Sequence, residues 1–259
     1  MSVTRLYAAE AVTAALSAES CCKPSDFHSE GVRVFELTPG RASNPLARRF
    51  SALENTLTIM SMGAGIVVAA TPELMPWASE LFLDAKDADD AFSLRILSEA
   101  SRRAEDSSLR LNGPYAYNVT SEQDWVNRRA PDGYVVEVGG AELLAGLEPA
   151  DWPNAVAPRR ASQGRLEAVA ALALHDDEVV GVASASTDSD TLWQIGIDVH
   201  SNYRGRGLGA ALTSRVARGV LDAGRVPYYG SSINNIASRR TAQSAGFYPS
   251  WVSVFTTGS

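Results

Sequence analysis

The chain has 259 residues, of which 45% are hydrophobic and 20% charged, and its 23 basic and 30 acidic residues give a formal net charge of −7. This is an ordinary globular composition, which excludes a wholly disordered chain, and the acidic surplus disfavours nucleic acid and anionic membranes as partners. No run reaches the roughly 18 apolar residues that a membrane span needs.

The amino-terminal stretch and the cysteines narrow the class of protein further. Glu10 interrupts the apolar stretch that an export signal would need, so we expect a cytoplasmic protein with an amphipathic helix over residues 4–17. The two cysteines, Cys21 and Cys22, are adjacent, and no Cys/His cluster with ligand spacing exists. The sequence therefore predicts neither a disulfide framework nor a metal site.

The first half of the chain predicts a small α+β domain over residues 1–130. After the first helix, the hydrophobic pattern indicates short strands and amphipathic helices, separated by turns that contain glycine or proline. Nothing in these elements demands chemistry of its own. The expected strands are 32–38, 57–61 and 65–71, and the expected helices are one that Pro72 opens and one over 88–105.

A charged connector separates this domain from a second one, which we expect over residues 131–259. Its predicted order is strand, helix, three strands, helix, strand, helix and strand. This is an α/β pattern, and its meander of three strands is unlike a doubly wound sheet. The expected elements are the strands 134–140, 191–200, 226–232 and 250–256, the hairpin strands on either side of 175–178, the short helix 141–147, and the helices 208–224 and 236–245.

A glycine-rich loop, from Arg204 to Ala210, lies between the strand 191–200 and the helix that follows. Glycine lets the backbone turn tightly and leaves room for a ligand to touch it. The first amides of a helix have no acceptor inside the helix, and the helix dipole is positive at that end. Together with the charges of Arg204 and Arg206, these features predict a site for a pyrophosphate group.

Three kinds of ligand compete for this loop. A nucleoside-triphosphate loop would carry Gly-Lys-Ser/Thr, which is absent. A dinucleotide fingerprint matches formally at Gly205, Gly207 and Ala210, but the next strand, 226–232, lacks the acidic residue that such a fold requires. The third ligand is the pyrophosphate of coenzyme A.

The loop resembles a motif of a known family. Arg204-x-x-Gly207-x-Gly209 matches the R/Q-x-x-G-x-G/A motif of the GNAT acyltransferases. The resemblance covers roughly residues 133–259. It implies a mixed central sheet with flanking helices and acetyl-CoA as co-substrate, without a metal.

A second block supports the same family. Asn235 to Ser238, with Gly246 and Phe247 downstream, resembles the family's second conserved block. The first half of the chain, around residues 73–77, faintly resembles the extension of one bacterial branch of GNAT proteins. The resemblance thus favours an amino-terminal domain that helps to build the acceptor site.

The resemblance also implies which groups hold the cofactor. Acetyl-CoA would lie at a splay between the strands 191–200 and 226–232, with main-chain groups of Ile197 and Val199 on the pantetheine arm and the thioester carbonyl. A main-chain N–H there would stabilise the oxyanion of the tetrahedral intermediate. Further cofactor contacts are expected from Arg204, Gly205, Arg206, Gly207, Leu208, Gly209, Ala210, Asn235 and Ser238.

The acceptor amine must lose a proton, so we expect a general base or a water relay. Alternation along the strand 191–200 places Ile195 and Ile197 on a core face and Asp198 and His200 on the other face. We predict Asp198 as the base, with His200 next. Two structural interpretations stay open: Asp198 only pairs with an arginine, and His200 is a solvated loop residue.

One position departs from the family pattern. Many relatives carry a tyrosine seven residues after the asparagine, which is thought to protonate the leaving thiolate, and here Ala242 stands in that place. Either another group protonates the thiolate, or the thiolate leaves without help. Tyr228 and Tyr229 are near in sequence, but nothing in the sequence places their hydroxyls.

These observations predict a GNAT-type N-acetyltransferase that moves an acetyl group from acetyl-CoA to a primary amine by direct attack. The acceptor stays open among a protein amino terminus, a polyamine, an aminoglycoside-like antibiotic and a small metabolite, and the oligomeric state stays open, a homodimer included. The alternatives are a non-catalytic acyl-CoA-binding or sensor module, which Ala242 favours, and an NAD-type binding domain.

Overall fold

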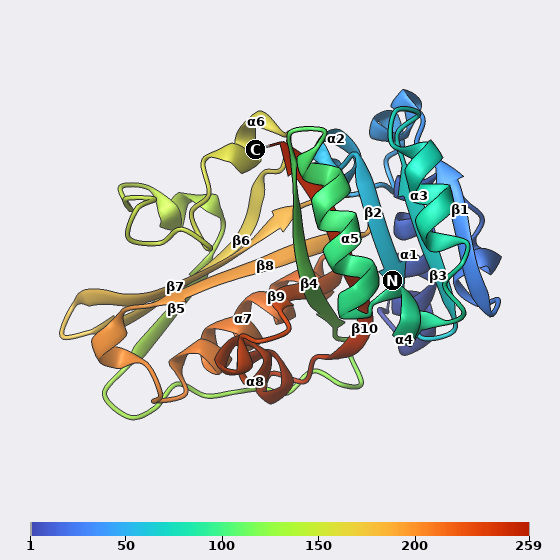
Figure 1. The fold of residues 1–259 in the computed structure, drawn as a ribbon. Helices are drawn as coiled ribbons and strands as arrows, with labels where there is room; N and C mark the ends of the chain where they lie inside the picture. The colour runs from blue at the N-terminus through green and yellow to red at the C-terminus, as the bar shows by residue number, and fades with distance from the viewer. Residues whose placement is uncertain (1, 259) are drawn as a thin grey trace. The chain divides into compact units, whose positions relative to one another are not determined.

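The computed structural model describes residues 2–258. The chain divides into two compact units that each draw on two stretches of sequence. Unit 1 comprises Met1–Ala11 and Tyr117–Pro249, and unit 2 comprises Val12–Ala116 and Ser250–Ser259. Both units mix helices with parallel and antiparallel strands (Figure 1). The mixed α/β class is therefore confirmed, whereas a domain boundary near residue 130 stays a prediction.

The strands of unit 2 lie in the order β1-β3-β2-β10-β4. β1 runs parallel to β3, and β2 runs antiparallel to both β3 and β10. The last strand of the chain thus completes a sheet that begins near residue 31. The strands are β1 (Gly31–Glu36), β2 (Leu57–Ser61), β3 (Gly65–Ala70), β4 (Leu109–Val119) and β10 (Tyr248–Gly258).

The helices in the first half of the chain differ from the prediction in several places. The helix that Pro72 was expected to open begins only at Met75, because residues 72–74 form a turn and Pro76 stands at the start of the helix instead, and a short helix over Arg49–Glu54 was not expected. The expected helix over 88–105 is wrong as one element, because Ser93 adopts an extended conformation and caps a new helix by accepting from the N–H of Ile96 at 3.3 Å. Buried residues of α3 and α5, such as Phe82 and Ile96, pack on β2 and β3. The helices are α1 (Arg5–Ser20), α2 (Arg49–Glu54), α3 (Met75–Phe82), α4 (Ala88–Ala91) and α5 (Leu94–Glu105).

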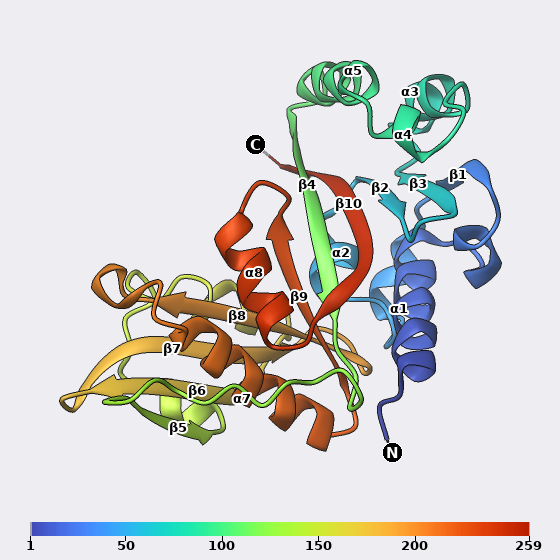
Figure 2. The ribbon, with the colours of Figure 1, turned by 90° about the horizontal axis from the view of Figure 1, so that it is seen from below.

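The strands of unit 1 lie in the order β9-β8-β7-β6-β5 (Figure 2). Neighbours are antiparallel except β8 and β9, which are parallel. Asp176 and Asp177 both have positive φ at the tip between β6 and β7, which confirms the expected hairpin. The strands are β5 (Val135–Gly139), β6 (Glu167–His175), β7 (Glu178–Thr187), β8 (Leu192–Val199) and β9 (Val226–Ser232).

Helix α7 (Leu208–Asp222) covers one face of this sheet and α8 (Ile236–Ser244) lies beside it. The predicted apolar face of α7 is buried, including Leu212 and Val216. The opposite face is covered by residues 141–166, which contain a 3-10 helix (Ala141–Leu144) and α6 (Arg159–Ser162). Burial of each large apolar side chain contributes about 1.5–3 kcal/mol.

No helix within residues 2–258 combines the length and the apolar character that crossing a membrane requires.

Candidate functional site

The loop before α7 has the backbone of an anion-binding turn. Gly205 and Gly207 have φ values of 76° and 90°, in the left-handed region that favours glycine. Gly207 is the residue at which α7 begins, and no side chain caps the helix there. A Cβ at either glycine would meet nothing within 4 Å. The loop therefore faces open space.

The main-chain N–H groups from Gly205 to Ala210 are unused within the described part of the chain. The first hydrogen bond of α7 runs from the N–H of Ala211 to the carbonyl of Gly207 at 3.1 Å, and the preceding amides donate to no acceptor of residues 2–258. Consecutive free amides at the positive end of a helix dipole are the usual partners of phosphate oxygens.

Two arginines place positive charge beside these amides. Arg204 Nε donates to the carbonyl of Val199 at 2.9 Å. Arg206 donates to the Tyr134 hydroxyl at 2.9 Å and to the carbonyl of Asn202 at 3.2 Å. These partners are neutral, so neither guanidinium is neutralised by them. An anion at the loop would meet charge as well as N–H groups.

The strands β8 and β9 separate before β8 reaches this loop. Their pairing is limited to three positions, the last being Gln194 opposite Tyr228, and Figure 2 shows the two strands diverging beyond it. His200 donates its N–H to Val180 of the neighbouring strand β7 at 2.9 Å. The N–H and carbonyl groups of successive residues point to alternate sides of a strand, so those of Ile195 and Ile197 point away from β7 toward β9, and only Ile197 lies beyond the last β8–β9 pair. The expected splay is present.

The predicted base, Asp198, is tied to a loop. Its carboxylate accepts from the main-chain N–H and the side-chain amide of Asn154 at 2.8 and 2.6 Å, and from the N–H of Ala155 at 2.9 Å. This loop lies so close to β8 that a Cβ at Gly196 would stand 1.9 Å from the Asn154 carbonyl. The interpretation that Asp198 pairs with an arginine is therefore wrong, because its partners are amides. Its catalytic role stays a prediction.

His200 is exposed at the end of β8, with its ring 6.1 Å from the Tyr203 ring. Its imidazole therefore faces solvent. Its catalytic role also stays a prediction.

The structure separates the two tyrosines that the sequence left unplaced. Tyr228 donates its hydroxyl to Asp188, which is 1% exposed and also paired with Arg165. The Tyr229 hydroxyl lies 2.8 Å from the hydroxyl of Ser238. The two side chains point to opposite faces of the sheet because they are consecutive in a strand.

Ser238 lies in the first turn of α8, where Asn235 accepts its N–H at 3.1 Å and so caps the helix. Burial raises the pKa of the Tyr229 phenol above its usual value, so the phenol keeps its proton near neutral pH. Ala242, where relatives carry a tyrosine, is fully buried in the core. β9 therefore places a protonated phenol against Ser238 in the first turn of α8, although Ala242 supplies no hydroxyl.

A polar cluster on the sheet face opposite α7 escaped sequence analysis. Arg165 binds both carboxylate oxygens of Asp188, at 2.7 and 2.9 Å, and donates to Gln194 at 2.6 Å. Gln194 is the last residue of β8 that pairs with β9, so this cluster braces the strands where they begin to part. Its arginine and carboxylate are 23 residues apart, and no local pattern reveals such a pairing.

Comparisons with known proteins fit this arrangement. Residues 141–247 match the acetyltransferase (GNAT) family. The comparison with curated proteins found no match.

Three solved structures illustrate the likeness. A GCN5-related N-acetyltransferase from Kribbella flavida is 16% identical, covers 80% of this chain and 88% of its own, and has a TM-score of 0.49. A GCN5-related N-acetyltransferase-like protein from Streptococcus suis 89/1591 is 17% identical, with coverages of 64% and 68% and a TM-score of 0.44. A GNAT-family acetyltransferase from Colwellia psychrerythraea is 14% identical, with coverages of 74% and 76% and a TM-score of 0.43.

The family match spans the hairpin, the splay, the glycine loop and both helices beside it. The resemblance seen in the sequence is therefore confirmed over residues 141–247, which match the model of the acetyltransferase (GNAT) family.

Proposed function

We propose that the protein is an acetyl-CoA-dependent N-acetyltransferase that acts on a primary amine. One observation carries the proposal: the free main-chain N–H groups of Gly205 to Ala210 face open space at the start of α7, next to a splay of two parallel strands. This arrangement suits a diphosphate joined to an extended arm, which is the form of acetyl-CoA.

The loop residues hold the diphosphate in this proposal. The amides from Gly205 to Ala210 donate to its oxygens, and Arg204 and Arg206 supply charge. Asn235 and Ser238 lie at the start of α8 as further cofactor contacts, although Asn235 already caps that helix. A charge-assisted contact at a helix amino terminus contributes about 0.3–1 kcal/mol at an exposed site.

The thioester lies in the splay, with its carbonyl oxygen at the main-chain N–H groups of Ile197 and Val199. The amine nitrogen attacks the thioester carbon, the C–N bond forms, and negative charge moves to the oxygen. The Ile197 N–H faces the open side and stabilises that oxyanion. Loss of such a donor raises a barrier by about 3 kcal/mol.

A base removes the proton that the attacking amine releases. Asp198 and His200 are the two candidates that we retain. The carboxylate of Asp198 already accepts three hydrogen bonds from the loop at Asn154 and Ala155, whereas the imidazole of His200 is exposed at the end of β8.

Collapse of the intermediate breaks the C–S bond and leaves a thiolate. We assign Tyr229 as the group that protonates it, through or beside the Ser238 hydroxyl. Tyr228 is unsuited to this role because its hydroxyl is engaged by Asp188. The partly exposed Ser238 connects the buried phenol to the side of the sheet on which α7 and α8 lie.

Calorimetry with acetyl-CoA, followed by a thiol-release assay with a panel of primary amines, tests this function. We expect saturable binding and turnover with at least one amine. Absence of saturable binding would discard the proposal. Binding without turnover for any amine would instead favour the non-catalytic sensor module, and preferential binding of a nicotinamide cofactor would favour the dinucleotide domain.

A further inference from the structure

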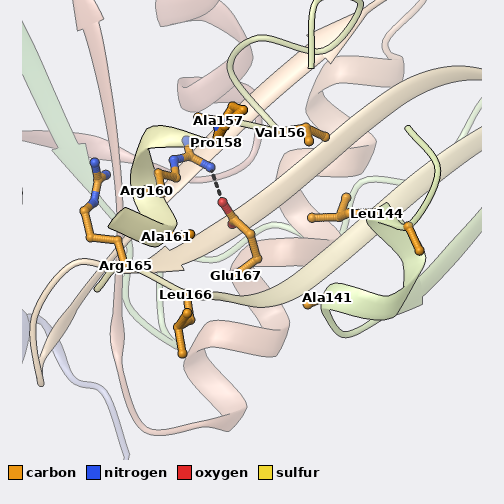
Figure 3. A pocket seen from close by; sticks show the side chains of 11 residues that line it. Ala141, Leu144, Val156, Ala157, Pro158, Arg160, Ala161, Arg165, Leu166 and Glu167 are labelled. Carbon is orange, nitrogen blue, oxygen red and sulfur yellow. Dashed lines mark hydrogen bonds and ion pairs between the residues drawn. The ribbon is translucent and has the colours of Figure 1, made fainter. Parts of the chain in front are cut away.

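A cavity on the sheet face opposite α7 has no part in the proposed cofactor site. It has a volume of about 450 Å³, which is within the range of small-ligand sites, and Figure 3 shows the side chains that line it. Its walls come from the 3-10 helix Ala141–Leu144, from α6 with the residues before it, and from the start of β6.

Most of the wall is apolar. The apolar lining residues are Ala141, Leu144, Ala145, Val156, Ala157, Pro158, Ala161 and Leu166. Three charged residues complete the lining: Arg160, Arg165 and Glu167. In Figure 3, Glu167 and Arg160 lie on one side, and Leu144 and Val156 lie across from them.

The two arginines have no need of a ligand. Arg160 donates to the carbonyl of Asn154 at 2.6 Å and to Glu167 Oε1 at 2.7 Å, and it is 7% exposed. Arg165 is held by Asp188. Their donors are directed into the protein, so the cavity does not present an anion-binding group.

Glu167 is different, because one of its oxygens is left over. Oε1 accepts from Arg160, whereas Oε2 is buried and has no hydrogen-bond partner in the described part of the chain. An acceptor that is buried without a donor is costly, and a ligand N–H relieves that cost. Glu167 is one of the residues that line the cavity, and its side chain is 15% exposed, so this carboxylate stands at the cavity wall.

We propose that this cavity binds a small primary amine with an apolar body, whose ammonium group donates to Glu167. The apolar wall takes the body, and the unpartnered oxygen takes the N–H.

The position of Glu167 relates the cavity to the splay. Glu167 pairs with Ser186, Ser186 with Gln194, and Gln194 with Tyr228, so the four residues form one row across the sheet. Two strand spacings, about 10 Å in total, separate Glu167 from the point where β8 and β9 part. The amine site is thus level with the splay, yet it stands independently of the proposed acetyl transfer.

Calorimetric titration of the full chain with hexylamine tests the proposal, with 1-hexanol as the matched ligand that lacks the ammonium. We expect saturable binding of hexylamine and at least about tenfold weaker binding of 1-hexanol. Glu167→Gln should weaken hexylamine binding by a similar factor, whereas Glu178→Gln, which removes an exposed carboxylate outside the cavity, should leave it unchanged.

Ala145→Trp supplies a second variant, because Ala145 is an exposed lining residue and an indole there fills the cavity without disturbing the core. It should abolish hexylamine binding while the thermal unfolding temperature stays at the wild-type value. Lack of saturable binding, or equal affinity of the wild type and both cavity variants, would overturn the proposal. Because binding is measured without acetyl-CoA, failure of the proposed transferase activity would not affect this result.

Discussion

The two helices beside the splay begin in opposite ways. Helix α8 is closed at its start, because Asn235 accepts the N–H of Ser238 at 3.1 Å. Helix α7 is uncapped at its start, because Gly207 offers no side chain and the amides from Gly205 to Ala210 have no acceptor within residues 2–258. Each helix follows a strand of unit 1 through a short loop, so the difference in capping comes from the loop sequences.

The amino termini of α7 and α8 therefore serve different purposes within one fold. A capped start stabilises its own helix by about 1 kcal/mol. An uncapped start forgoes that stabilisation and leaves its N–H groups for an external anion. Substitutions at the two starts should therefore affect different quantities: ligand affinity at α7, and stability or proton transfer at α8.

The largest effect is expected at Gly207, where α7 begins without a cap. Gly207→Asp should weaken acetyl-CoA binding by at least about 100-fold, because a carboxylate would face the diphosphate and a left-handed φ of 90° strains any side chain. Calorimetry measures the change, and circular dichroism confirms that the fold is intact. Gly207→Ala isolates the strain, since its methyl group meets no neighbour, and should lose much less affinity. Equal affinity of Gly207→Asp and the wild type would mean that the loop is not the diphosphate site.

At the capped start of α8, the hydroxyl groups of Tyr229 and Ser238 are expected to take part in catalysis. Tyr229→Phe should lower kcat by roughly 100-fold, because the leaving thiolate loses its proton donor, and should leave the Kd for acetyl-CoA within about twofold. Stopped-flow thiol release separates the two quantities. If kcat stays at the wild-type value, Tyr229 is not the proton donor.

The same phenol predicts a pH dependence of stability. Burial raises the pKa of Tyr229, so above about pH 10 the unfolded chain releases a proton that the folded chain retains. The stability from this group is fully present below pH 10 and is lost as pH rises through the folded-state pKa. Urea unfolding between pH 8 and pH 11 should therefore show a smaller alkaline loss for Tyr229→Phe. Identical pH profiles would contradict the assignment.

The two candidate bases, Asp198 and His200, lie at the end of β8, the strand that precedes α7. Asp198→Asn should lower stability by about 1–3 kcal/mol, because a neutral amide replaces the carboxylate that holds the N–H groups of Asn154 and Ala155. His200→Gln should leave stability nearly unchanged. The pH profile of kcat/KM ranks them as bases: the residue whose loss removes the acidic limb is the base. If both variants retain that limb, neither residue is the base.

The smallest effect is expected from the cap itself. Asn235→Ala should lower the free energy of unfolding by about 1 kcal/mol, because the Ser238 N–H loses its acceptor. Asn235→Asp keeps an acceptor and should retain stability, but its charge should weaken acetyl-CoA binding if Asn235 contacts the cofactor. Urea unfolding and calorimetry measure the two effects. Wild-type stability of Asn235→Ala would show that the cap does not stabilise α8.

The sequence predicted the elements whose hydrophobic pattern is local. β2 and β9 occupy the residues expected for them, because each is bounded by clear turns. β4 was missed, because Gly113 and Pro114 interrupt its pattern, and glycine and proline ordinarily argue against a strand interior. The break at Ser93 was missed because apolar spacing continues across it.

The candidate site divides in the same way. The loop from Arg204 to Ala210 is contiguous, so its residue types and order indicated an anion site. The bonds from Asn154 to Asp198 span 44 residues, and the orphaned oxygen of Glu167 depends on how β6 meets α6. Such features arise from tertiary packing, and a single sequence carries no pattern for them.

A crystal structure of this chain with coenzyme A would show which groups hold the diphosphate. We expect its oxygens within hydrogen-bond distance of the N–H groups between Gly205 and Ala210, and the pantetheine arm between β8 and β9. A bound coenzyme A whose diphosphate lies elsewhere, with those amides still unpaired, would contradict this expectation.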